Sequence, residues 1–281
     1  MSFLRVFVLL TLVSTIQAQD SHPPLTQISA CNLINRIVRI DTDVMHGSGV
    51  IIDPDGWIVT ALHVVADQKT FVEYGNINVT VSGFRRPFPA QVASKIDQVA
   101  SVRDLAILKI DRTKLPYIEI EDRKAEHPLG SPVAIIGIPI SARFGSGGPI
   151  PTFCLSGTIA AQESFSLGGL NYIRRIYFQG VSIKGISGAP IILLESGKVI
   201  GIVSTKLTGI STGLDEARSR ILATRNAGAT IFLGVDLLQT LGGLIDTLDD
   251  QLANGLGGGS GSTDIALALV QAKQEYKRQK P

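Results

Sequence analysis

The chain has 281 residues, a formal net charge of +2, 44% hydrophobic residues and 18% charged residues. This composition is typical of a globular protein with enough apolar material for a large core. Because positive and negative charges nearly balance, the composition gives no reason to expect nucleic acid as a partner.

Residues 1–18 have the layout of a secretory signal. Arg5 precedes an apolar run from Val6 to Val13, and small or polar residues follow up to Ala18. The run is too short to span a bilayer, and no other stretch approaches about 18 uninterrupted apolar residues. The sequence therefore predicts a secreted or periplasmic protein that is not stably inserted in a membrane after signal cleavage. An N-terminal membrane anchor is the alternative.

Residues 19–33 predict an exposed N-terminal arm, because Pro23 and Pro24 stand among polar neighbours. The chain has two cysteines, Cys31 and Cys154. In an oxidising compartment they could form one disulfide that ties the arm to the second half of the chain. Two buried free thiols are the alternative, since the sequence does not give their separation.

From Ile34 onward, short β-branched runs are broken by glycine, proline or aspartate, which predicts barrel strands. Asp53-Pro54-Asp55-Gly56 joins two such runs and predicts a hairpin. The length accommodates two six-stranded barrels that share a cleft, over residues of about 34–120 and 130–235.

One stretch of the second half combines a serine with flanking glycines. Ser187 lies between Gly185 and Gly188, whose backbones can adopt angles that other residues resist. A serine hydroxyl becomes a nucleophile only with a base in reach and with donors aimed at the oxyanion that it creates. The amides of Gly185 and Ser187 are candidates for those donors.

A base and a carboxylate occur upstream of this serine. His63 ends a strand-like apolar run, and Asp104 opens another, so the chain order is histidine, aspartate, serine. Of the orders known for serine triads, this is the one used by trypsin-type enzymes. The remaining histidines, His22, His46 and His127, lack such a context and are predicted to be surface residues.

These motifs together carry a resemblance to a known family. The chain resembles the trypsin-like peptidases, and more closely their Do-like (high-temperature-requirement, HtrA/Deg) branch, over residues of about 34–253. The matching segments, in the order expected of the family, are Gly47–Ile52, Asp55–Thr60, Ala61–Val65, Asp104–Leu108, Ile136–Pro139, Ser156–Ile159 and Gly185–Pro190. The resemblance implies an all-β fold of two six-stranded antiparallel Greek-key barrels with a C-terminal helix.

The resemblance also implies a secreted serine endopeptidase. Ser187 would be the nucleophile, His63 its base and Asp104 the group that orients the histidine, with the backbone amides of Gly185 and Ser187 as the oxyanion hole. Polypeptides would be the substrates, homo-oligomers are possible, and neither a metal nor an organic cofactor is needed.

The substrate cleft would be lined by Val203, Ser204 and Thr205. No acidic residue occurs over residues 178–184, where trypsins place the carboxylate that captures arginine or lysine. A pocket without fixed charge favours small or medium apolar side chains, because an unpaired cation would lose its hydration there.

Two positions depart from the family pattern. Ile186 stands where the family usually has asparagine, and Ala189 stands where it usually has glycine. A catalytically weak or inactive protease-fold binding protein is therefore the alternative function. Since Ile186 cannot pair with a freed N-terminus as the aspartate of digestive trypsins does, we also expect that activity does not require a cut after Arg36.

The C-terminal part is predicted from periodicity and composition. Residues 236–253 carry a helical apolar stripe and predict a helix that closes the peptidase domain. Residues 254–263, mostly glycine and serine, predict a flexible linker. Residues 264–281 form a basic tail that either packs loosely or docks a partner, and they are too few for the peptide-binding PDZ domain that Do-like enzymes often append.

Overall fold

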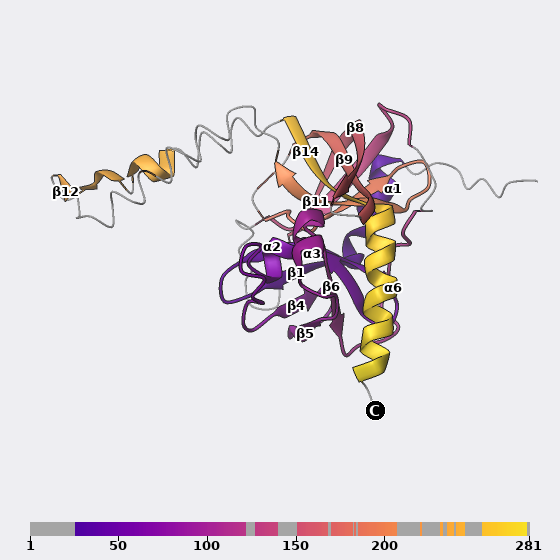
Figure 1. Ribbon diagram of the computed structural model, residues 1–281. Coiled ribbons are helices and arrows are strands. Elements are labelled where there is room, and N and C mark those ends of the chain that lie inside the picture. Colours follow the sequence, from indigo (N-terminus) through magenta and orange to yellow (C-terminus); the bar gives the residue numbers. More distant parts are fainter. Residues whose placement is uncertain are drawn as a thin grey trace, which may run out of the picture.

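The computed structural model describes residues 26–121, 127–139, 151–167, 170–181, 183, 185–206, 220, 231–232, 235–238, 240–244 and 255–279. The predicted signal over residues 1–18 lies outside them, as does most of the predicted arm. Figure 1 shows two β-barrels stacked one above the other, with a long C-terminal helix that begins at the base of the upper barrel and runs down beside the lower one.

The first barrel is closed and follows the strand order β1-β2-β3-β6-β5-β4. Its strands are β1 Ile37–Asp41, β2 His46–Asp53, β3 Trp57–Thr60, β4 Asn78–Val81, β5 Phe88–Val92 and β6 Ala106–Ile110. Short helices interrupt or precede these strands: α1 Gln27–Cys31, the 3-10 helix η1 Asn32–Arg36, α2 Leu62–Val65 and α3 Gln98–Arg103.

The second barrel is closed as well, in the order β10-β11-β14-β9-β8-β7. Its strands are β7 Pro132–Gly137, β8 Phe153–Leu167, β9 Leu170–Gly180, β10 Pro190–Leu193, β11 Val199–Lys206 and β14 Gly255–Gly261. A separate two-stranded sheet joins β12 Ile231–Phe232 to β13 Val235–Asp236. The two antiparallel six-stranded barrels and the C-terminal helix confirm the predicted fold class.

Alternate residues of the strands face two different cores. Val38 and Ile40 of β1 pack inside the first barrel, while Ile37 packs in a cluster that both barrels share. In β2, Ile51 points into the barrel and Val50 into the shared cluster. Because successive side chains of a strand point to opposite faces, continuous apolar runs bury both faces and join the barrels.

The glycine-rich segment near the C-terminus is a strand. The sequence predicted a flexible linker over residues 254–263, and this is wrong for Gly255–Gly261, which form β14 between β11 and β9. A Cβ on Gly257 would overlap the Phe178 ring, and one on Gly258 would lie 2.7 Å from the Tyr177 ring. Glycine is needed here because neighbouring groups approach the backbone closely. With β14 as one of its strands, the second barrel extends beyond its predicted end at residue 235.

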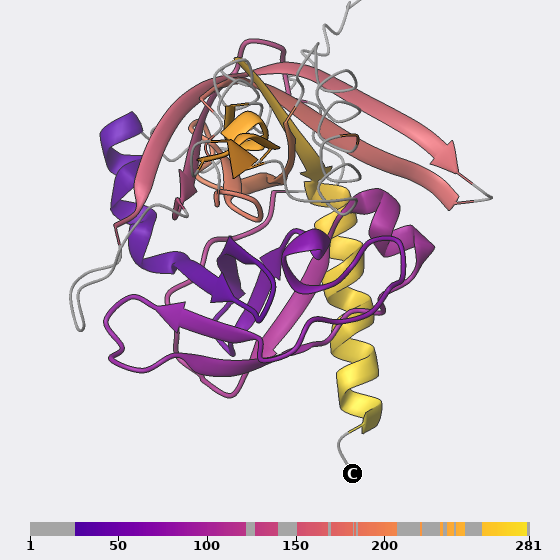
Figure 2. The same cartoon turned by 90° about the vertical axis from the view of Figure 1, so that its left-hand side faces the viewer.

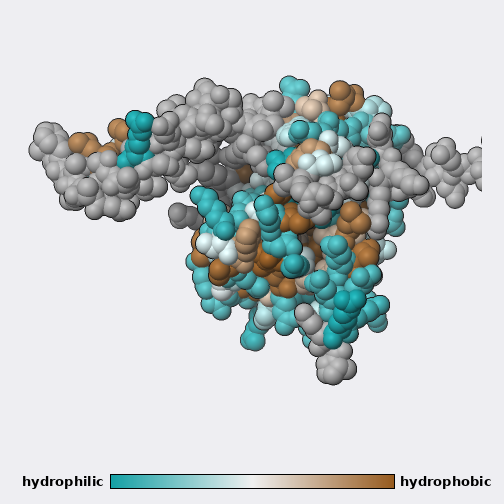
Figure 3. Space-filling model, viewed as in Figure 1, coloured by the Kyte–Doolittle hydropathy of each residue, from teal (hydrophilic) through white to brown (hydrophobic). Residues whose placement is uncertain are grey.

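Helix α6 Ser262–Gln279 begins directly after β14 and contacts β6, β9, β11 and β14 (Figure 2). Ile265 and Ala272 are buried in the shared cluster, and the Tyr276 ring packs edge-on against Trp57 at 5.5 Å between centroids. Figure 3 shows hydrophilic side chains gathered near the C-terminal end of this helix. The predicted loose tail over residues 264–281 is thus a docked helix over most of its length.

The predicted closing helix over residues 236–253 is described only in part, and that part does not bury its apolar stripe. Residues 237–238 and 240–244 are helical, but the side chains of Leu237, Leu241 and Leu244 are exposed. Residues 245–253 lie outside the described part of the chain. An apolar stripe predicts a helix without saying which surface accepts it, and α6 is the helix that packs on the barrels. None of the helices in the described residues is long and apolar enough to cross a membrane.

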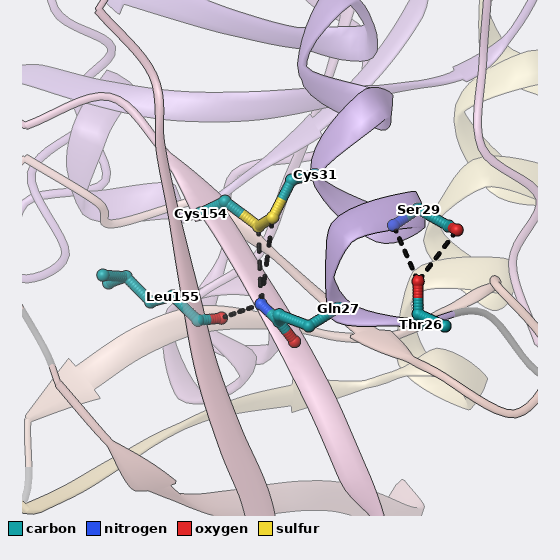
Figure 4. The surroundings of a disulfide bond; sticks show 6 residues. All are labelled: Thr26, Gln27, Ser29, Cys31, Cys154 and Leu155. Carbon is teal, nitrogen blue, oxygen red and sulfur yellow. Dashed lines mark hydrogen bonds between the residues drawn. A yellow bond between two sulfur atoms is a disulfide. The ribbon is translucent and has the colours of Figure 1, made fainter.

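Cys31 and Cys154 form a disulfide with 5.6 Å between their Cα atoms (Figure 4). The bond joins α1 to β8. Of the two alternatives that the sequence left open, a disulfide or two free thiols, the structure contains the disulfide. Gln27 covers the bond and donates from Nε2 to the Leu155 carbonyl oxygen at 3.2 Å. Thr26 caps α1 by accepting from the Ser29 amide at 3.1 Å.

Candidate active site

His63 lies on the single turn of α2, directly after β3. Its neighbours Leu62, Val64 and Val65 are fully buried in the first-barrel core, which leaves the imidazole facing outward with its side chain 25% exposed. The core thus fixes the backbone of this turn while the histidine side chain remains accessible.

Asp104 ends α3 and binds His63 twice. Its Oδ1 accepts from the His63 amide at 3.0 Å, and its Oδ2 lies 2.8 Å from His63 Nδ1. The residue is 7% exposed and has a φ of 50°, a left-handed conformation that disfavours a side chain. With Nδ1 as the protonated nitrogen facing this carboxylate, Nε2 is free to accept a proton.

Ser187 lies in a tight turn of residues 185–189, called here the Ser187 turn. Gly185 and Gly188 have φ angles of 95° and 84°, which supports the sequence argument for glycine at both positions. A Cβ on Gly188 would overlap Ser48 O and Thr60 Oγ1, so the turn lies against the end of β3 that leads to His63. Within the described residues, no hydrogen bond joins Ser187 Oγ to His63.

Ser48 of β2 connects the first barrel to the Ser187 turn. Its hydroxyl is fully buried, donates to the Gly185 carbonyl oxygen at 3.0 Å and accepts from the Ile138 amide at 2.9 Å. Its amide donates to the Ser187 carbonyl oxygen at 2.8 Å. Thr60 Oγ1 donates to the Ser48 carbonyl oxygen at 2.7 Å, so every polar group of Ser48 has a partner.

The two amides expected to form an oxyanion hole are those of Gly185 and Ser187. In the described part of the chain, neither amide donates to a protein acceptor, whereas the amides of Gly188 and Ala189 do. The Gly185 carbonyl oxygen accepts from the Ser48 hydroxyl. Among the described residues, the two expected oxyanion-hole amides thus have no protein acceptor.

Ile186 anchors the turn by packing. Its side chain is 1% exposed and lies in the second-barrel core with Ala189. A Cβ on Gly137 would lie 2.9 Å from Ile186 Cβ, so β7 and the turn are in close contact. Apolar burial thus holds the position that departs from the family pattern, without an ion pair.

The three residues expected to line the cleft lie on β11. The Val203 side chain is buried in the second-barrel core, and its backbone bonds to the Ser187 turn: its amide donates to Ala189 O at 2.9 Å and its carbonyl accepts from Gly188 N at 2.7 Å. A β-bulge lies between Val203 and Thr205, at Ser204, which is partly buried. The Thr205 side chain lies outside what the structure describes.

A cavity of about 600 Å³ lies on the second barrel, lined among others by His127, Arg174 and Arg175. None of the three candidate triad residues lines it, and we assign it no role. His127 was predicted to be a surface residue, which is wrong because it is 7% exposed. Burial lowers the pKa of His127, partly against the negative charges of Glu121 and Glu195.

Sequence reasoning missed the supporting residues of the site. Ser48 stands in the glycine-flanked segment that carries the resemblance, but the sequence does not reveal that its hydroxyl reaches the Ser187 turn. The contacts of Arg103 with Ser260 and Asp264 were missed because the segment containing both was interpreted as linker and tail.

Two closed barrels that meet at such a site are the architecture of trypsin-like serine proteases. A family model described as "Trypsin-like peptidase domain" matches residues 47–202, which is more than half of the chain. The chain belongs to the trypsin-like peptidase family.

Curated proteins similar to this chain carry names of the HtrA and DegP type. "Serine protease HTRA1A" of Danio rerio is 32% identical over 182 residues, 63% of this chain and 34% of that protein. "Probable periplasmic serine endoprotease DegP-like" of Chlamydia pneumoniae is 28% identical over 214 residues, 75% of this chain and 39% of that protein. The chain spans less than two fifths of the length of these curated relatives.

Solved structures share the fold over most of the chain. The active form of the Rv3671c protease from M. tuberculosis has a TM-score of 0.54 at 18% sequence identity. The aligned part covers 96% of this chain and 94% of the Rv3671c chain. An inactive form has a TM-score of 0.53 at 20% identity and covers 90% and 91%. At these identities the similarity shows the fold alone.

Proposed function

We propose that this protein is a serine endopeptidase in which His63, Asp104 and Ser187 form the triad. The observation that carries the proposal is the double attachment of Asp104 to His63, at the amide and at Nδ1. This arrangement fixes the tautomer and the orientation of the imidazole, which is the role of the aspartate in such triads. The comparisons support the proposal because the named relatives are serine proteases.

In the proposed reaction, Ser187 Oγ attacks the carbonyl carbon of a peptide bond while His63 Nε2 takes the hydroxyl proton. The amides of Gly185 and Ser187 stabilise the oxyanion of the tetrahedral intermediate. As the C–N bond breaks, His63 gives its proton to the leaving amine. A water molecule, deprotonated by His63, then hydrolyses the acyl-enzyme and restores the serine hydroxyl.

We expect cleavage after small or medium apolar residues. The support is the absence of an acidic residue over residues 178–184 and the apolar Val203 beneath the Ser187 turn. A cationic side chain would be desolvated in such a pocket without a partner. Peptides with valine or alanine directly before the cleaved bond should be turned over faster than peptides with arginine or lysine at that position.

The proposed location is outside the cytoplasm, in the periplasm or a secreted fraction. The Cys31–Cys154 disulfide supports it, because structural disulfides persist in oxidising compartments. The word "periplasmic" in the names of several relatives agrees. Polypeptides are the proposed substrates.

A second candidate function is peptide binding without turnover. One observation favours it: among the described residues, Ser187 Oγ makes no hydrogen bond to His63. Catalytic hydrogen bonds are often long in unliganded proteins and tighten with substrate, so this observation does not outweigh the His63–Asp104 pair.

Covalent labelling separates the two functions. A fluorophosphonate probe should label the wild-type protein, Ser187→Ala should abolish the labelling, and His63→Ala should slow it strongly, because the serine then lacks its base. Ser196→Ala, which changes a serine on an exposed turn, is the matched control and should label like the wild type. Equal labelling of the Ser187→Ala variant would refute the assignment, and peptide binding by an unlabelled wild type would support the second function.

A further inference from the structure

The end of helix α3, next to Asp104, is held by groups from the second barrel and from helix α6. Arg175 Nη2 of β9 donates to the Val102 carbonyl oxygen at 2.9 Å. The Ser260 hydroxyl of β14 donates to the Arg103 carbonyl oxygen. Asp264 Oδ1 of α6 lies 2.9 Å from Arg103 Nε.

These contacts are buried. Asp264 is 0% exposed, Ser260 is almost as inaccessible, and the Arg103 side chain is 11% exposed. Asp264 Oδ2 also accepts from the Arg174 amide at 2.9 Å. The Arg103–Asp264 pair is close, but its atoms are not aligned for a hydrogen bond. A buried ion pair contributes little net stability compared with apolar packing, and the best-attested use of such pairs is to fix one arrangement.

Asp104 depends on the position of this helix end. It is the C-cap of α3, and its amide donates within the same turn, to the Ser101 carbonyl oxygen at 3.1 Å. Its left-handed backbone disfavours a side chain and persists only where the surrounding structure holds it. A shift of the last turn of α3 would therefore move the carboxylate relative to His63.

We propose that Asp264 and Ser260 are positioning residues for the proposed protease reaction. Together they hold Arg103, and thereby place the Asp104 carboxylate against the His63 imidazole. Strand β14 and helix α6 are then part of the support of the active site, although in the described part of the chain no hydrogen bond or ion pair joins either of them to the triad residues. This inference rests on the proposed function.

The pKa of Asp264 fits this picture. Burial raises it, while the Arg174 amide and the positive charges of Arg103 and Arg174 oppose that effect. The positive charge of Arg103 thus acts against the effect of burial on this carboxyl.

Asp264→Asn is the informative variant, because it keeps the shape and an acceptor for the Arg174 amide but removes the charge. Misplacement of a catalytic group by about 1 Å can lower turnover on the order of 100-fold, so we expect kcat to fall at least about tenfold. KM should stay within about twofold, since the substrate contacts are untouched. Ser260→Ala should give a smaller effect of the same kind, and it serves if the asparagine variant does not fold.

Lys273→Met is the matched control. Lys273 lies on α6 as well and pairs with Asp53 at 2.5 Å, away from α3. The Lys273→Met variant should weaken the packing of α6 on the barrels without changing kcat or the pH profile of kcat/KM. A purely structural role of Asp264 predicts that both variants behave alike.

The readout that a structural role would not move is the hydrogen bond between Asp104 and His63 Nδ1. With Asp104 displaced this bond is lengthened or lost, so the downfield NMR signal of the His63 Nδ1 proton should weaken or move in Asp264→Asn, and the pH profile of kcat/KM should differ from that of the wild type. An unchanged Nδ1 proton signal with unchanged kcat would overturn this inference while leaving the protease function intact. If the wild type neither labels nor turns over peptide, the proposed function fails, and the Nδ1 proton signal alone still decides whether Asp264 positions Asp104.

Discussion

The Ser48 hydroxyl donates to the Gly185 carbonyl oxygen at 3.0 Å, so a side chain of the first barrel fixes a peptide group of the Ser187 turn in the second. The same hydroxyl accepts from the Ile138 amide, which follows β7. One buried hydroxyl thus ties β2 of the first barrel to the Ser187 turn and to the residue after β7 in the second.

Ser48→Ala should lower kcat by about tenfold or more, because the Ser187 turn loses its fixed position relative to His63. The variant leaves a buried amide and a buried carbonyl without partners, at a cost of about 1–3 kcal/mol each at most. Kinetics with a chromogenic peptide and thermal unfolding measure the two effects. Ser94→Ala is the matched control, because it removes one hydroxyl that accepts from a backbone amide, that of Ile107, without a bond to the Ser187 turn. Wild-type kcat in Ser48→Ala would contradict the role given to this hydroxyl.

Gly188→Ala should abolish activity and destabilise the fold. Its added Cβ would overlap Ser48 O and Thr60 Oγ1, and its φ is 84°. Gly83→Ala is a close control, since Gly83 has the same φ of 84° but no atom within 4 Å of an added Cβ. The control should lose about 1–2 kcal/mol of unfolding free energy from the left-handed backbone alone. Urea denaturation of both variants gives the difference, and equal losses would show that the Ser187 turn is not tightly packed.

Breaking the Cys31–Cys154 disulfide should lower the free energy of unfolding by about 2–5 kcal/mol, because the bond closes a long loop in the unfolded chain. The two cysteines are 123 residues apart in the sequence. Urea denaturation of the wild type with and without reductant measures the effect. The double variant Cys31→Ser/Cys154→Ser is the control and should not respond to reductant. A wild type whose stability is unchanged by reductant would argue against the bond.

The Lys273–Asp53 pair should make stability depend on acidity. Burial acts to raise the pKa of Asp53, but the hydrogen bond from Lys273, the Asp55 amide and the charges of Lys273 and Lys109 together hold it below its ordinary value. A carboxyl whose pKa is depressed in the folded protein contributes stability above its ordinary pKa and loses it as the pH falls through the folded value. Lys273→Met should therefore be less stable than the wild type by up to about 1 kcal/mol at neutral pH.

This difference should close below the folded pKa of Asp53, where the carboxyl is protonated with or without its partner. Urea denaturation at neutral pH and at acid pH measures it. The double variant Asp53→Asn/Lys273→Met removes the titrating group and should show no further change with pH relative to Asp53→Asn. A gap that persists undiminished in acid would mean that Lys273 acts by packing on Trp57, whose ring lies 5.7 Å from its Nζ.

Much of the fold could be predicted from local signals. The turn at Asp53–Gly56 and the β-branched runs predict barrel strands because turn chemistry and alternation act over a few residues. His63 and Asp104 lie together in the first barrel, where His63 follows β3 and Asp104 precedes β6. Gly185 and Gly188 have positive φ angles of 95° and 84°, which is the property for which the sequence argument singled out glycine there.

Other features depend on contacts that no local pattern contains. Gly257 and Gly258 have the composition of a linker, and only the rings of Phe178 and Tyr177, far away in the sequence, make glycine necessary there. Leu241 and Ile265 both lie on helical apolar stripes, yet only Ile265 is buried. The position of a helix on the barrels is set by the shape of the surface that receives it, which the sequence does not spell out.

The place of β14 in the second barrel has a consequence for protein synthesis. Ribosomes release residues in order, so β9 and β11 present unpaired edges until Gly255–Gly261 have been made. Asp264 follows still later, and with it the contact of its carboxylate with Arg103, the residue before Asp104. The candidate active site therefore gains this support only after β14 and the first turn of α6 have been synthesised.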